Sequence, residues 1–67
     1  MKLGKYKHFK GKFYEVIGLA KHSETQEELV IYYDENKQLW ARPKSMFLEE
    51  IDKPEYNYKG PRFIYIE

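Results

Sequence analysis

The stretch from Gly4 to Thr25 constrains the fold more than any other part of this 67-residue chain. Side chains alternate between two faces from Lys5 to Phe9 and again from Phe13 to His22, with the period of two that is typical of strands. Gly11 lies between these runs, where a tight hairpin turn needs a positive φ. The stretch therefore predicts two antiparallel strands, the second of which is longer and ends in a polar loop.

Both faces of the second run are largely apolar, which predicts a central place in the sheet. Gly18 interrupts this run, and an isolated glycine inside a strand indicates a bend or a bulge.

Further short strand patterns follow. Leu29–Tyr33 is rich in β-branched and aromatic residues, and Gln38–Arg42 is a short strand that Pro43 ends because proline supplies no N–H. Beyond it we expect a single 3-10 turn at Pro43–Met46 and an extended segment at Phe47–Ile51. A turn-rich segment at Asp52–Pro61 and a final strand at Arg62–Ile66 follow. A short helix over Ser45–Asp52 is the alternative.

These elements predict an all-β fold, namely a small SH3-like barrel of five or six short strands with a one-turn 3-10 helix, in a single domain over residues 1–67. Closure of the barrel would remove exposed sheet edges. The chain has no cysteine, so neither disulfides nor a cysteine-based zinc site can stabilise it. Aromatic residues make up 18% of the chain and predict an aromatic core, with dimerisation as a further source of stability.

The net charge of +1 gives no general bias toward nucleic acid or anionic membranes. Five lysines and no acid lie within residues 2–12, which is typical of a soluble strand edge. No apolar run has the length of a signal peptide or approaches the roughly 18 residues of a membrane-spanning helix. We therefore expect a cytoplasmic protein without membrane contact.

The two histidines invite a metal or acid–base interpretation. The hairpin, however, places His8 and His22 at opposite ends, which argues against a shared metal ion. We expect His8 to be partly buried near Tyr14, with a ring nitrogen bonded to the backbone.

The polar loop that begins at His22 is the first candidate site, because functional residues concentrate at strand ends. A histidine, hydroxyls and a carboxylate in one loop could activate a nucleophile, with His22 and Glu24 as acid and base of a small hydrolase. The alternative is that Ser23 and Thr25 cap backbone N–H groups of the turn.

Trp40 and Arg42 are two residues apart and should project from the same face of their strand. Arg42 can stack on an indole or hold a carboxylate, either from this chain or from a partner. The predicted ligand-binding residues are therefore His22, Ser23, Glu24, Thr25, Trp40 and Arg42.

The segments GKYKHFKGKFYEVIGLAKHSETQEELVIYY, LWARPKSMF and PRFIYI resemble a bacterial family of short proteins classed as a domain of unknown function. The family pattern is G-x-Y-x-H-F-K-G-x-x-Y-x-V, H-S-E-T, L-W-x-R-P-x-x-M-F and P-R-F. The resemblance covers Gly4 to Ile66, with no clear departure at the motif positions. It implies a stand-alone bacterial cytoplasmic domain and brings no activity, substrate or cofactor.

The sequence thus favours a non-catalytic module that binds a protein or another ligand, without a cofactor or a metal, over an enzyme. An RNA-binding domain is the alternative, with Tyr6 and Phe9 interleaved in the basic segment Lys2–Lys12. The small hydrolase is a weaker alternative, and a homodimer remains open.

Overall fold

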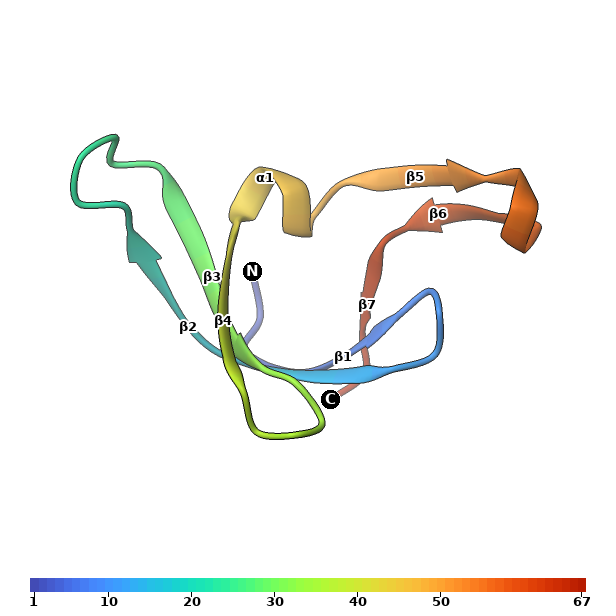
Figure 1. Ribbon diagram of the computed structural model, residues 1–67, viewed down its shortest axis with the longest axis horizontal. Coiled ribbons are helices and arrows are strands. Elements are labelled where there is room, and N and C mark those ends of the chain that lie inside the picture. The colour runs from blue at the N-terminus through green and yellow to red at the C-terminus, as the bar shows by residue number, and fades with distance from the viewer.

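The computed structural model describes residues 1–67 and contains a five-stranded antiparallel sheet and a separate two-stranded hairpin (Figure 1). The strand order of the large sheet is β4-β3-β2-β1-β7, and the hairpin is β5-β6. The elements are β1 (Gly4–His8), β2 (Phe13–Lys21), β3 (Glu28–Tyr33), β4 (Leu39–Pro43), α1 (Lys44–Phe47), β5 (Glu50–Lys53), a 3-10 turn (Pro54–Tyr56), β6 (Tyr58–Pro61) and β7 (Phe63–Tyr65).

The first hairpin is confirmed. Tyr6 on β1 lies opposite Tyr14 on β2, and Gly11 in the turn has a φ of 103°. β2 is the middle strand of the sheet, and its register against β3 shifts between Val16 and Gly18. The bulge predicted at Gly18 is therefore present, and it bends the strand.

One face of the large sheet, which we call the inner face, carries the core. Phe47 of α1 packs onto this face, and its ring stacks on that of Phe63 at 4.1 Å with an interplanar angle of 1°. Figure 1 shows α1 lying across this side of the sheet. The buried cluster consists of Tyr6, Val16, Val30, Tyr32, Phe47 and Phe63.

The all-β class is confirmed, but the sheet does not close into a barrel. β4 and β7 stand at opposite ends of the strand order, and neither pairs with the other. The guanidinium of Arg42 on β4 lies 5.9 Å from the ring centre of Phe63 on β7. The two edges therefore meet through side chains and not through a hydrogen-bonded ladder, and the SH3-like relationship stays a prediction.

The segment after β4 differs most from the sequence-based expectation. The single helical turn is α-helical and spans Lys44–Phe47, so the expected 3-10 turn at Pro43–Met46 and the longer helix over Ser45–Asp52 are both wrong. The segment Asp52–Pro61, expected to be turn-rich, contributes most of the β5-β6 hairpin. Gly60 and Pro61 are tolerated in β6 because this hairpin has only two strands, and each is therefore an edge.

No helix in the structure combines the length and apolar character needed to cross a membrane.

Candidate functional site

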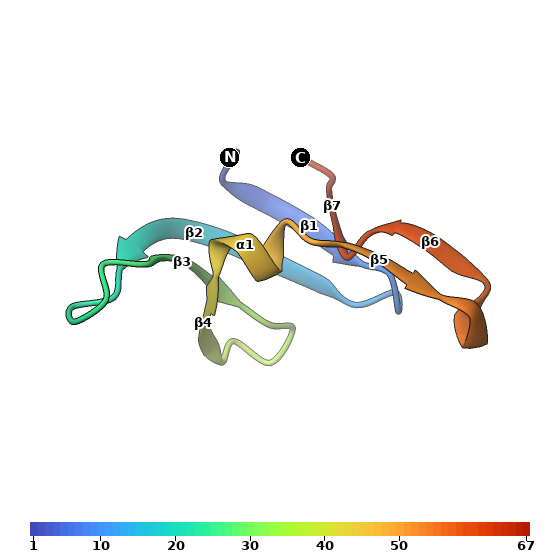
Figure 2. The same ribbon diagram turned by 90° about the horizontal axis from the view of Figure 1, so that it is seen from above.

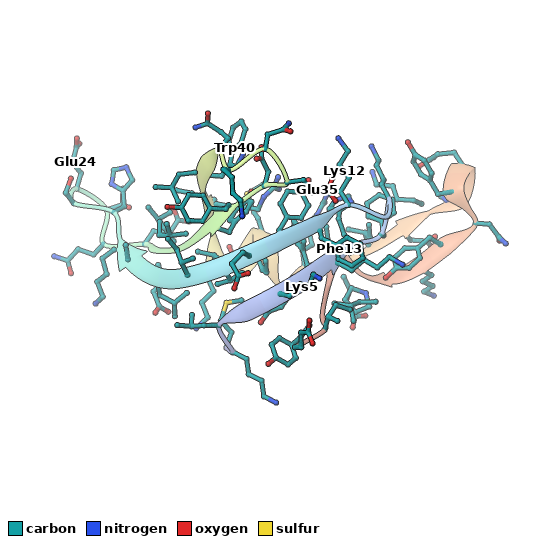
Figure 3. The ribbon with its side chains drawn as sticks, turned by 90° about the horizontal axis from the view of Figure 1, so that it is seen from below. Lys5, Lys12, Phe13, Glu24, Glu35 and Trp40 are labelled. Atoms are coloured by element: carbon teal, nitrogen blue, oxygen red, sulfur yellow. The ribbon has the colours of Figure 1, made fainter.

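The predicted polar loop forms the tip of the β2-β3 arm, and Glu24 lies at this far end (Figure 3). Nδ1 of His22 accepts hydrogen bonds from the N–H groups of Glu24 at 3.1 Å and of Thr25 at 3.4 Å. Oγ1 of Thr25 accepts the N–H of Glu27 at 3.2 Å. The capping role expected for Thr25 is thus confirmed, whereas the ring of His22, and not the hydroxyl of Ser23, caps the other N–H groups of the turn.

Trp40 and Arg42 project from the same face of β4, as the sequence predicted. Their partners on β3 are the buried Tyr32 and Val30, so both side chains lie on the inner face. Trp40 is 50% exposed, and its indole N–H donates to Oδ2 of Asp34 at 2.9 Å. Arg42 stacks over Phe63 and not over Trp40, and its Nε–H donates to the hydroxyl of Tyr32 at 3.4 Å.

The loop and the β4 pair do not form one site. Arg42 lies opposite Val30, whereas the loop begins one residue beyond the pair formed by Lys21 and Glu28. Every hydrogen bond made by the His22 ring stays within the loop. The convergence of His22, Glu24 and Arg42 that a hydrolase would need is absent. No group of three or more acidic or histidine side chains is arranged to hold a metal ion.

His8 occupies the structural position expected for it. Its ring lies among Phe9, Tyr14 and Phe63, with centroid separations of 4.5, 6.2 and 4.9 Å, and Nδ1 accepts the N–H of Lys10 at 3.1 Å. Desolvation by burial lowers the pKa of this imidazole, and the nearby charges of Arg62, Lys10 and Arg42 lower it further. The surroundings of His8 therefore favour the neutral form of its imidazole.

The β3-β4 turn is organised by Asp34. Its Oδ1 accepts the N–H groups of Asn36 at 2.8 Å and Gln38 at 2.9 Å, while Oδ2 accepts the indole N–H of Trp40. The bond from Trp40 is the main cause that lowers the pKa of Asp34, followed by the bond from Gln38. Asp34 thus fixes the exposed indole, a role that the turn pattern alone did not reveal.

The opposite side of the large sheet, which we call the outer face, is also largely apolar. Residues that alternate with the core project from it, and cross-strand pairs join Tyr33 to Leu39 and Ile31 to Ala41. Phe13 and Leu39 are 37% and 47% exposed. Figure 3 looks onto this face, and no other element of the chain covers β1 and β2 there.

Lysines from β1 flank the aromatic residue at one end of this face. The Nζ atoms of Lys5 and Lys7 lie 4.9 and 5.9 Å from the ring centre of Phe13. Oε2 of Glu35 accepts the backbone N–H of Phe13 at 3.0 Å and ties the β3-β4 turn to the start of β2. A shallow hollow of about 130 Å³ lies here, lined by Lys5, Phe13, Tyr14, Glu15, Asp34 and Glu35.

The sequence reasoning missed the outer face as a candidate site. Leu29–Tyr33 is apolar on both faces, as is most of β2, for which we interpreted this pattern as a central place in the sheet. The same pattern also occurs when one apolar face is left uncovered. Apolar character at every position of Leu29–Tyr33 was therefore the signal that could have identified this surface.

Comparisons with known proteins agree with the resemblance noted from the motifs. A crystal structure of a DUF1653 protein from Bordetella bronchiseptica superposes with a TM-score of 0.87 at 30% sequence identity, covering 98% of this chain and 87% of that one. None of the curated proteins matches the chain. The family model described as "Protein of unknown function (DUF1653)" matches residues 4–65. The chain belongs to the DUF1653 family.

Proposed function

We propose that this chain is a non-catalytic protein-binding module that contacts its partner through the outer face of the five-stranded sheet. The observation that carries this proposal is the apolar surface of the outer face, where Phe13, Leu39 and Ala41 are exposed and Ile31 and Tyr33 are half-buried. An antiparallel sheet with one solvated face normally presents polar residues there. A contiguous exposed apolar surface is typical of an interaction site.

The charges at the margin favour a protein partner over RNA. Lys5 and Lys7 lie beside Phe13 and suit acidic groups around an apolar patch of the partner. Glu15 is paired directly with Lys5 on the same face, and Glu35 is hydrogen-bonded at Phe13. These carboxylates would repel a phosphate backbone, which weakens the RNA alternative.

The setting we propose is the bacterial cytoplasm, supported by the family member from Bordetella bronchiseptica and by the bacterial pattern of the motifs. The loop residues His22 to Thr25, together with Trp40 and Arg42, are the alternative binding residues predicted from the sequence, and binding by the outer face does not use them. They supply the control for the experiment that follows.

The test is affinity capture from a lysate of the native host, with wild type, Phe13→Ser and Ile64→Ser as baits. Both substituted residues lie opposite Lys7 on the outer face, and both are exposed. Ser23→Ala at the loop tip is the matched control, because the Ser23 side chain makes no hydrogen bond in the structure. Captured proteins are quantified by mass spectrometry with and without nuclease.

The proposal expects one protein to be enriched by wild type and Ser23→Ala, lost with both outer-face variants, and retained after nuclease treatment. Capture that disappears with nuclease would establish the RNA alternative instead. Loss with Ser23→Ala and retention with Phe13→Ser would move the site to the loop. Circular dichroism of each bait confirms that it is folded.

A further inference from the structure

The free edge of β4 presents backbone groups that pair with no other backbone group in the chain. The N–H of Asp34 donates to the carbonyl of Gln38 at 3.0 Å, which marks the first hydrogen-bonded pair of the β3-β4 ladder. Hydrogen-bonded and non-bonded pairs alternate in an antiparallel ladder. The pairs Tyr32 with Trp40 and Val30 with Arg42 are therefore bonded, and the backbone groups of Leu39, Ala41 and Pro43 face outward.

Nothing in the chain lies beyond this edge. β4 is the terminal strand of the sheet, and Figure 2 shows it at the rim of the molecule. Ala41 is exposed, and Leu39 is 47% exposed. An unpaired strand of this kind is a template for another strand.

Two features restrict which strand can pair here. Pro43 has no N–H, so a carbonyl placed opposite it would lack a donor. Within the chain, Nε2 of Gln38 donates to the carbonyl of Leu39 at 3.2 Å, so this carbonyl needs no donor from a partner. A second copy of β4 that places its Leu39 opposite this Pro43 would therefore leave no backbone group without a hydrogen-bond partner.

The sequence of β4 meets that requirement when it is paired with itself. In an antiparallel register centred on Ala41, the two Ala41 residues exchange both backbone hydrogen bonds. Each Leu39 N–H then faces the carbonyl of Pro43 in the other copy. The Leu39 carbonyl, already bonded to Gln38, faces the proline nitrogen.

The side chains are self-complementary in the same register. Trp40 of one copy lies directly opposite Arg42 of the other on the inner face, and cation–π contact between arginine and tryptophan is favourable. On the outer face, Leu39 lies opposite Pro43 and the two Ala41 residues meet. Like charges are not brought together at any position of the strand.

We propose that two copies of this chain associate through β4, antiparallel about a two-fold axis at Ala41, to form one continuous ten-stranded sheet. The interface is isologous, as in most homodimers. A chain with seven buried residues among 67 has a small core, so an added ladder is a substantial gain. The dimer uses the edge of β4, so it goes beyond the proposed binding by the outer face.

Single-cysteine variants test this register directly, because the chain contains no cysteine. At the two-fold axis the Cα atoms of an Ala41→Cys pair would be about 5.5 Å apart, within the range that a disulfide spans. Leu39→Cys is the matched control on the same strand and the same face. Its Cα atoms would be about 14 Å apart along the paired strands, too far for a disulfide.

The variants are oxidised under identical mild conditions, and the linked dimer is measured on a non-reducing gel over time. Light scattering of wild type, over a wide range of concentration, gives the mass. We expect a dimer mass at high concentration and disulfide formation on the order of a hundredfold faster for Ala41→Cys than for Leu39→Cys. Circular dichroism verifies that both variants fold.

Equal, slow oxidation of both variants with a monomer mass at every concentration would overturn the dimer. Faster oxidation of Leu39→Cys would overturn the register. A monomeric wild type whose Ala41 amide becomes protected from hydrogen exchange only when another protein is added would show that β4 pairs with a foreign strand, which also contradicts the proposal.

Discussion

The two faces of the large sheet are both apolar, yet they differ in what covers them. On the inner face, Phe47 and Phe63 stack with Tyr6 and Tyr32 around them, and the cluster is buried. On the outer face, Phe13 and Leu39 remain exposed. The inner face therefore holds the fold together, whereas the apolar residues of the outer face are free to contact a partner. The difference separates residues that stabilise the chain from residues that are available for binding.

The largest expected effect comes from Phe47→Ala on the inner side. Phe47 is 1% exposed, and removal of a buried phenylalanine costs about 3–5 kcal/mol in the free energy of unfolding. This is comparable with the whole stability of a domain of this size, so the variant should be largely unfolded. Urea unfolding followed by circular dichroism measures the loss. A cost below about 1 kcal/mol would show that α1 does not close the core.

Two glycines, one on each face, differ in backbone conformation and in the space around them. Gly4 lies opposite Val16 on the inner face with a φ of 128°, and an added Cβ would be 2.5 Å from the carbonyl oxygen of Glu67. Gly18 lies opposite Ile31 on the outer face, where an added Cβ meets nothing. We expect Gly4→Ala to cost about 1–3 kcal/mol and Gly18→Ala to change the stability by less than about 0.5 kcal/mol.

The same urea experiment compares both glycine variants with wild type. Equal effects at the two positions would contradict the crowded, positive-φ setting of Gly4 and the open setting of Gly18.

The neutral imidazole of His8 gives the inner face a pH dependence. Its pKa in the folded chain lies below the ordinary value of 6.5. Between the lowered pKa and 6.5, the unfolded chain binds the proton more strongly. The free energy of unfolding should therefore fall as the pH drops through 6.5 and should stop falling, as far as His8 is concerned, below the folded pKa.

NMR titration of the His8 ring protons checks the direction of the shift, and urea unfolding at several pH values checks the linkage. A midpoint at or above 6.5 would contradict burial of His8 among the rings of the core.

The smallest effect on stability is expected at the outer face. Phe13→Ser removes an exposed ring and its contacts with Lys5 and Lys7, which should change the free energy of unfolding by less than about 1 kcal/mol. Urea unfolding measures this change, and the capture experiment measures binding by the same variant. A loss of stability as large as that of Phe47→Ala would mean that Phe13 belongs to the core.

Local patterns in the N-terminal half predicted the structure well. The alternation on either side of Gly11 is a short-range signal, and the hairpin follows from it, although its turn is centred on Lys10, and Tyr6, not His8, lies opposite Tyr14. The bulge at Gly18 also depends on one residue and its own strand. The separation of His8 from His22 followed from the same hairpin. In each case the determining residues are close together in the sequence.

Long-range arrangement could not be predicted in the same way. Whether β4 meets β7 depends on how Phe47 and Phe63 fill the space between distant strands, and the sequence pattern contains no measure of that space. The β5-β6 hairpin was missed because Gly60 and Pro61 are typical turn residues. The candidate site was predicted in part: Trp40 and Arg42 share a face, but the ring of His22 bonds to its own loop.

NMR of the isotopically labelled chain, with and without its captured partner, shows whether the outer face binds a protein. Amide signals of outer-face residues such as Phe13, Tyr33 and Ile64 should shift or broaden on addition of the partner, while those of the loop from His22 to Thr25 should not. Changes confined to that loop, with the outer-face signals unmoved, would rule out binding by the outer face.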